Sequence, residues 1–187
     1  IGSPIDFNFF DLKKLDAGKF FYKKNTEISI PSLEEVLNFC SQNNINLNIE
    51  IKPNLGFEHK NIQAINKLLK IYHFKNKFYF SIFDFNSIIL MKELMPKSYY
   101  GLLIDDFTSE LSLENIINFC VQSNIFCCGF DKKIINDEII SKLINKNIFV
   151  NIFSDNNISL SDANDLWSKG IKSIFIDDPS EFKFINP

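Results

Sequence analysis

Polar and apolar side chains alternate strictly through residues 46–53. The polar residues are Asn46, Asn48, Glu50 and Lys52, and the apolar residues between them are Leu47, Ile49 and Ile51. Because side chains in a β-strand repeat with a period of two, the polar set shares one face of the strand. A carboxylate and an ammonium near the end of that face can meet ligands, and burying them without a function is costly. The pattern favours a reaction site at Glu50 and Lys52, although a surface edge strand would alternate in the same way.

Short β-rich segments and amphipathic stretches alternate along the chain with a repeat of roughly 25 to 30 residues. Six strands are predicted: 47–51, 78–83, 100–104, 125–130, 148–153 and 173–176. The first clear helix opens with a capping box at Ser32–Glu35 and runs to about Asn43. Further helices are predicted near 61–71, 87–94, 113–122, 137–145 and 162–169. This alternation is typical of a parallel sheet with helices outside it, either doubly wound or closed into a barrel.

Two observations favour the barrel. First, no glycine-rich phosphate loop follows any strand, so the usual site of an open sheet is missing. Second, polar residues gather where nearly every strand ends, as barrel enzymes require: Ser81 and Asp84, Asp105 and Asp106, Asp131 and Lys132, Ser154 to Asn156, and Asp177 and Asp178. As an alternative, Asp84, Asp106 and Asp178 only cap the helices that follow them.

A (β/α)₈ TIM barrel needs eight strands, and the sequence supplies six. Because the last strand runs almost to the end of the chain, we expect strands 3 to 8 to be present and strands 1 and 2 to be missing before Ile1. Residues 1–30 would then form an excursion between strand 2 and helix 2. We expect residues 1–187 to be a single barrel domain in which the six strands form an open arc.

Composition excludes several classes of function. A net charge of −3 with scattered lysines gives no basic field, so we expect no nucleic-acid partner. No run of about 18 apolar residues occurs, so no membrane span is expected, and the cytoplasm is the predicted location. All 20 basic residues are lysine, so a bound phosphate would be met by point charges, amides or a metal. Buried thiols are expected for Cys40, Cys120, Cys127 and Cys128, which lack zinc-ligand spacing.

Several short motifs follow one another in a fixed order. They are Leu15–Gly18, Ile30–Leu37, Asn48–Lys52, Ser81–Phe83, Gly101–Leu103, Phe153–Asn156 and Ile174–Asp177. In that order they resemble the L-D-[AV]-G, P-[ST]-L-x-E-[VL]-L, N-[IV]-E-[IL]-K, S-S-F, G-L-L, [WY]-T-x-N and I-x-T-D motifs of glycerophosphodiester phosphodiesterases. The resemblance covers the whole chain.

This resemblance implies a metal-dependent hydrolase that cleaves a small-molecule glycerophosphodiester into glycerol 3-phosphate and an alcohol. It implies that Glu50 is a ligand of a divalent cation, Mg²⁺ or Ca²⁺, and that Lys52 contacts the phosphate and stabilises developing negative charge. By the same resemblance, the aromatic ring of Phe153 would lie beside the glycerol. Ser81 and Asn156 are further candidates for substrate binding.

The sequence also departs from the family pattern. The H-R-G strand, the E-x-D pair and the H-D turn of the family all precede its L-D-[AV]-G motif, and none occurs here. His59 and His73 lie in or beside a helix and are not expected to act as acid or base. Ser154 and Ile82 replace a threonine and a serine, and Phe153 lacks the usual polar tip. We therefore expect this chain alone to be inactive. Two alternatives remain: a degenerate barrel used as a binding or structural module, and an unrelated barrel in which Lys52 forms a Schiff base.

Overall fold

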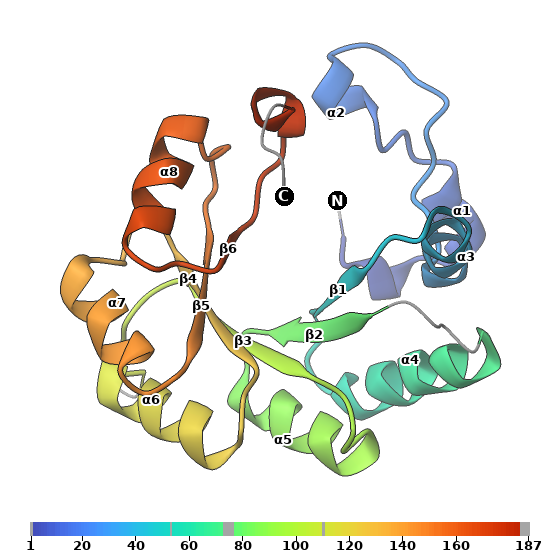
Figure 1. Cartoon of the computed structure of the whole chain (residues 1–187). Helices are drawn as coiled ribbons and strands as arrows, with labels where there is room; N and C mark the ends of the chain where they lie inside the picture. The colour runs from blue at the N-terminus through green and yellow to red at the C-terminus, as the bar shows by residue number, and fades with distance from the viewer. Residues whose placement is uncertain (1, 53, 73–76, 110, 184–187) are drawn as a thin grey trace. The chain divides into compact units, whose positions relative to one another are not determined.

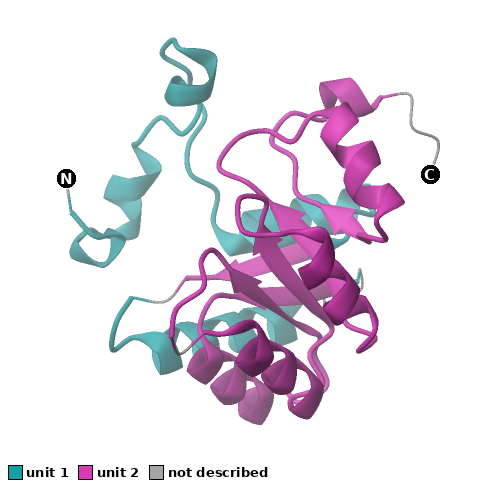
Figure 2. Ribbon diagram, turned by 90° about the vertical axis from the view of Figure 1, so that its left-hand side faces the viewer, with its two compact units in different colours: residues 1–47, 53–77 teal, residues 48–52, 78–187 magenta. Residues whose placement is uncertain are grey.

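The computed structural model describes residues 2–52, 54–72, 77–109 and 111–183 of the chain. These residues fall into two compact units, coloured separately in Figure 2. Unit 1 comprises residues 1–47 and 53–77, and unit 2 comprises residues 48–52 and 78–187. The single domain expected over residues 1–187 stays a prediction.

Unit 2 is built on a sheet whose six strands follow one another in sequence order. The strands are β1 (Leu47–Ile51), β2 (Phe78–Ile82), β3 (Tyr100–Ile104), β4 (Cys127–Asp131), β5 (Phe149–Phe153) and β6 (Ser173–Ile174). Strands β2 to β6 pair in parallel. In Figure 1 they follow an arc with helices on its outer side, namely α5 (Phe85–Leu94), α6 (Leu113–Gln122), α7 (Asp137–Ile144) and α8 (Leu160–Ser168). The predicted α/β fold with six strands is confirmed, although β6 is shorter than expected.

The outer face of the sheet carries the apolar core of unit 2. Tyr100 defines this face, because its hydroxyl lies 3.0 Å from the carbonyl oxygen of Met91 and 2.6 Å from that of Met95, at the end of α5. The residues on the same face of β3 and of the neighbouring strands are all buried: Phe80, Ile82, Leu102, Ile104, Cys128, Phe130, Val150 and Ile152. Burying each large apolar side chain stabilises the fold by roughly 1.5 to 3 kcal/mol. The strand pattern therefore fixes which face the helices cover.

The inner face of the sheet is crowded at its centre, and two glycines make room there. A Cβ atom at Gly101 would lie 2.8 Å from Cys127 Sγ, and one at Gly129 would lie 2.7 Å from Leu103 Cδ2. Side chains of neighbouring strands thus occupy the space over both glycines. Any larger residue at either position would push these neighbours aside.

Unit 1 contains short helices and one structured loop. Its elements are η1 (Pro4–Asp6), α1 (Phe9–Lys13), α2 (Lys19–Tyr22), α3 (Leu33–Asn43) and α4 (Glu58–Tyr72). The Asp16 carboxylate accepts hydrogen bonds from the backbone of Gly18, Lys19 and Thr26 and from the Thr26 hydroxyl. These bonds, that of the Thr26 hydroxyl above all, lower the pKa of Asp16. In the described part of residues 1–46 no strand is assigned, as expected for an excursion.

The predicted capping box at the start of α3 is confirmed. Ser32 Oγ accepts a hydrogen bond from the Glu35 amide at 3.2 Å, and the Glu35 carboxylate accepts one from the Ser32 amide at 2.6 Å. Lys13 Nζ lies 2.8 Å from the same carboxylate. The Lys13 hydrogen bond, followed by those of Ser32, lowers the pKa of Glu35 to about 2.

None of the helices in the described residues is long and apolar enough to cross a lipid bilayer. All four cysteines are buried, as predicted. Burial raises the pKa of Cys127 to about 12 and that of Cys128 well above its usual value.

Substitution Tyr100→Phe tests the tie between β3 and the end of α5. Because the hydroxyl is buried and hydrogen-bonded, we expect the free energy of unfolding to fall by about 1 kcal/mol, with an unchanged denaturant m-value. Urea unfolding measures this change. The matched control is Tyr99→Phe, whose ring is 62% exposed; an equal loss in the control would contradict the assignment.

Candidate functional site

Glu50 and Lys52 lie at the carboxyl end of β1, and their burial follows the alternation of the sequence. Ile49 and Ile51 are buried, whereas the side chains of Glu50 and Lys52 are 36% and 74% exposed. Lys52 Nζ is 2.7 Å from Glu50 Oε1. The two side chains therefore form an ion pair that is exposed to solvent. A ligand can reach it there.

Two aromatic rings extend this pair across the sheet. Lys52 Nζ lies 5.7 Å from the ring centroid of Phe83, the residue that follows β2. The Phe83 ring in turn meets the ring of Phe153, the last residue of β5, edge-on at a centroid distance of 5.9 Å. The structure thus brings Lys52 and Phe153, two of the predicted site residues, to the same ring.

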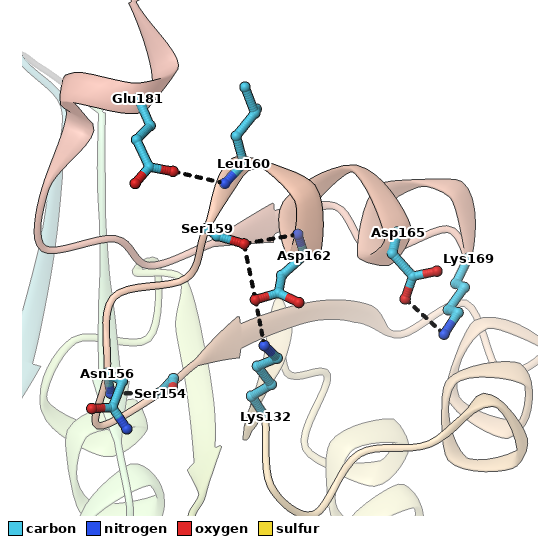
Figure 3. Close-up of polar contacts among 9 residues, drawn as sticks. All are labelled: Lys132, Ser154, Asn156, Ser159, Leu160, Asp162, Asp165, Lys169 and Glu181. Atoms are coloured by element: carbon cyan, nitrogen blue, oxygen red, sulfur yellow. Dashed lines mark hydrogen bonds and ion pairs between the residues drawn. The ribbon is translucent and has the colours of Figure 1, made fainter.

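The other two substrate-binding candidates differ in their placement. Ser81 on β2 is fully buried, and its Oγ has no hydrogen-bond partner among the described residues. Asn156 is exposed in the loop after β5, where its backbone N–H donates to Ser154 Oγ at 3.3 Å (Figure 3). Among the described residues, no recorded contact joins Asn156 to Glu50, Lys52 or Phe83.

Asp131 and Lys133 form a second charged pair at this edge that we did not select from the sequence. Asp131 ends β4 opposite Phe153 and is only 4% exposed. Its Oδ1 accepts from the Lys133 amide at 2.8 Å, and its Oδ2 lies 3.4 Å from Lys133 Nζ. The pKa of Lys133 is raised, first by its bond to Asp131 and then by the charges of Asp131, Asp155 and Asp106. One sign of this pair was in the sequence. Asp131 is two residues after Gly129 and therefore lies on the same inner face of the strand.

Polar contacts tie together the loops after β4, β5 and β6 (Figure 3). Lys132 Nζ lies 2.7 Å from Asp162 Oδ2, and Ser159 Oγ donates to the same carboxylate oxygen at 3.0 Å. Glu181, in η2 (Pro179–Phe182), accepts a hydrogen bond from the Leu160 amide at the start of α8. These contacts hold the carboxyl-end loops of three neighbouring strands in one arrangement.

The capping interpretation of the strand-end acids holds for two of the three. Asp84 accepts from the Ser87 amide and caps α5, and Asp178 accepts from the Ser180 amide and caps η2. For Asp106 it is wrong: its carboxylate accepts from the adjacent Phe107 amide, and Ser112 caps α6 instead. The loop between β3 and α6 is long enough to separate the acid from the helix.

Metal-ligating groups are sparse in the described part of the chain. No group of three or more His, Cys, Asp or Glu residues that could hold a metal ion occurs there. His59 is exposed on α4, as expected, and His73 lies outside the described residues. Glu50 therefore supplies one carboxylate, whereas Ca²⁺ and Mg²⁺ take about six oxygen ligands.

Substitution Asp162→Asn tests the loop contacts. The hydrogen bond from Lys132, and next that from Ser159, lowers the pKa of Asp162. The contribution of Asp162 to stability is therefore complete above its unfolded pKa and is lost as pH falls through the lower folded value. We expect the variant to have a lower thermal midpoint at about pH 6 and the difference to close near pH 2. Asp165→Asn, which removes only a pair with Lys169 within α8, should show a smaller difference; a gap independent of pH would contradict the ion-pair explanation.

Comparison with known proteins gives consistent matches. The sequence profile of the glycerophosphoryl diester phosphodiesterase family matches residues 4–181. A glycerophosphodiester phosphodiesterase of Caldanaerobacter subterraneus is 36% identical over 106 residues, which are 54% of this chain and 42% of that protein. Another from Bacillus altitudinis is 26% identical over 185 residues, 95% of this chain and 71% of that protein. The first of these matches thus spans less than half of that relative's length.

Solved structures agree on the fold. A phosphodiesterase of Oleispira antarctica, solved with its product sn-glycerol-3-phosphate, superposes with a TM-score of 0.80 at 24% identity, covering 93% of this chain and 68% of that one. A Galdieria sulphuraria protein assigned to the glycerophosphodiester phosphodiesterases superposes with a TM-score of 0.78 at 17% identity, covering 97% of this chain and 70% of that one. With a family profile that matches almost the whole sequence, the chain belongs to the glycerophosphoryl diester phosphodiesterase family.

Proposed function

We propose that this chain is part of an enzyme that hydrolyses glycerophosphodiesters to glycerol 3-phosphate and an alcohol. The observation that carries the proposal is the solvent-open Glu50–Lys52 pair at the end of β1, beside the Phe83 and Phe153 rings. Family membership supports the reaction class. The Oleispira relative, with glycerol 3-phosphate as its product, supports the substrate class.

In this proposal β1 to β6 correspond to strands 3 to 8 of a TIM barrel. The support is the strand order, six parallel neighbours in sequence order without the two needed to complete eight. The solved relatives are longer than the matched region, which leaves room for two further strand–helix units. Those units would supply the acid and base that the described residues lack.

Lys52 is the proposed phosphate-binding residue. Its side chain is 74% exposed, and its ammonium is held near the strand end by Glu50 and the Phe83 ring. A fixed positive charge there lowers the barrier because the charge on the phosphoryl oxygens grows in the transition state. The phosphate of the substrate and the Glu50 carboxylate compete for the Lys52 ammonium.

Glu50 is the proposed ligand of a divalent cation, Mg²⁺ or Ca²⁺, on which enzymes of this family generally depend. The described residues do not make a complete site, because they provide one carboxylate and no cluster of three ligands. We therefore assign to this chain a share of the site and leave the remaining ligands to the missing units.

Phe153, Ser81 and Asn156 are the proposed substrate-binding residues. The Phe153 ring, packed against Phe83, offers an apolar surface for the glycerol carbons. The Asn156 side chain is exposed at the same edge of the sheet, and Ser81 lies buried on β2.

The cytoplasmic location inferred from the sequence stays a prediction.

A non-catalytic barrel used for binding is the second candidate. It is favoured by three departures from the family motifs. Ile82 replaces a serine, Ser154 replaces a threonine, and the ring of Phe153 lacks a polar tip. Such a protein would bind glycerol phosphates without turning them over, so an activity assay separates the two candidates.

The test uses this chain extended upstream in its own reading frame by about sixty residues, two strand–helix units of about thirty residues each. We call this the extended protein. We expect it to release glycerol 3-phosphate from glycerophosphocholine with added Mg²⁺ or Ca²⁺, and to stop when the metal is chelated. Residues 1–187 alone should be inactive. Turnover by residues 1–187, or no turnover by the extended protein, would contradict the proposal.

Two substitutions in the extended protein separate the roles of the charged pair. Glu50→Gln should lower metal affinity and rate together. Lys52→Ala should lower kcat by about a hundredfold and raise KM less, because its charge is most useful in the transition state. Steady-state kinetics over a metal titration measure both, and full activity in Glu50→Gln would rule out its role as a ligand.

A further inference from the structure

Three buried side-chain atoms in the described residues have no hydrogen-bond partner: Asn48 Oδ1, Ser81 Oγ and Ser87 Oγ. Leaving a buried polar group unpaired costs about 1 to 3 kcal/mol, so such groups are rare without a reason. Ser87 belongs to helix α5 on the outer side of the sheet. The other two lie on β1 and β2, the strands that carry the candidate site.

Two observations point to Ser81 as the neighbour of Glu50 on the adjacent strand. In the β2–β3 pair, the Phe80 amide donates to the Tyr99 carbonyl, and Phe80 faces Tyr100. The Leu47 amide donates to the Lys77 carbonyl in the same way, and β1 and β2 are neighbours in the sheet. From this bond and from the contact between Lys52 and the Phe83 ring, we infer that Glu50, two residues before Lys52, lies beside Ser81, two residues before Phe83.

On the other side of Ser81, the neighbouring strand offers no partner. Ser81 pairs in register with Gly101, which has no side chain. Asn48, two residues before Glu50 on β1, shares its face and carries the other unpaired atom. The polar group nearest in register to the Ser81 hydroxyl is thus the Glu50 carboxylate, which in this structure is paired with Lys52 at 2.7 Å.

We propose that Ser81 is a positioning residue that donates its hydroxyl hydrogen bond to the Glu50 carboxylate when Lys52 leaves Glu50 to bind the phosphate of the substrate. The inference rests on the proposed function, because it takes Lys52 as the phosphate-binding residue. In the metal-free protein the exchange keeps both charges partnered: phosphate takes the ammonium, and the serine hydroxyl takes its place at the carboxylate. In the free protein the unpaired Ser81 hydroxyl is destabilising, but it is available to bind Glu50.

Through this exchange Ser81 affects the affinity of the protein for phosphate, although its side chain does not touch phosphate. A carboxylate that loses its ammonium without a replacement donor keeps competing for Lys52. Hydrogen bonds to charged groups are stronger than those between neutral groups. Removing the hydroxyl should therefore weaken the binding of phosphate at Lys52 by about tenfold.

The experiment compares Ser81→Ala with Ser87→Ala in the extended protein. The two substitutions are chemically identical, and each removes one buried, unpaired hydroxyl. The probe is inorganic phosphate, and the measurements are the thermal midpoint without phosphate and the phosphate dissociation constant from calorimetry. Lys52→Ala and the pair Glu50→Gln and Glu50→Gln/Ser81→Ala complete the set.

We expect both alanine variants to keep or raise the thermal midpoint without phosphate, because each loses an unsatisfied polar group. Only Ser81→Ala should weaken phosphate binding, by about tenfold. In the Glu50→Gln background the further change Ser81→Ala should have a much smaller effect, since a residue that acts through Glu50 is coupled to it.

The outcomes separate this inference from the function beneath it. If phosphate binding does not depend on Lys52, the proposed function fails, and the role of Ser81 fails with it. If phosphate binds through Lys52 but Ser81→Ala matches Ser87→Ala, only the role of Ser81 is overturned. An undiminished effect of Ser81→Ala in the Glu50→Gln background would likewise show that Ser81 does not act through Glu50.

Discussion

The contact between Phe83 and Phe153 constrains the rest of unit 2. These rings follow β2 and end β5, which are separated by β3 and β4. In a flat sheet, three strand spacings of about 4.8 Å would keep them about 14 Å apart. Their centroids are 5.9 Å apart, so the sheet must curl toward its inner face. That curvature is what turns a row of strand ends into a shared site.

The small residues of the inner face make the curvature possible. Curling crowds the inner side chains, and Gly101 and Gly129 occupy the points where Cys127 Sγ and Leu103 Cδ2 come closest. On the outer face the same curvature spreads the strands, and the large residues that pack under the helices fill that surface. The alternation of side chains along each strand thus supplies residues for packing on the outer face and residues for the candidate site on the inner face. The loops after β4, β5 and β6 then set the rim through Lys132, Asp162 and Glu181.

Local patterns in the sequence predicted most of the fold. The strand period of two, the α3 capping box and the strand-end polar residues all depend on neighbours in the chain, and all appear in the structure. The site was harder. Glu50 and Lys52 were found because their alternation is local, and Phe153 through its family motif. The Asp131–Lys133 pair was missed because only the three-dimensional register sets it opposite Phe153. Asp106 was misjudged because loop length, not residue type, decides whether an acid reaches the next helix.

The four buried thiols are divided between the two units: Cys40 belongs to unit 1, and Cys120, Cys127 and Cys128 belong to unit 2. A thiol reacts with an alkylating reagent as its exposed thiolate, and burial raises the pKa of Cys127 and Cys128. Modification of these side chains must therefore wait for the surrounding structure to open. The native chain consequently carries its own reporters of local opening in both units, and the order in which they are alkylated tells whether the two units open together or one at a time.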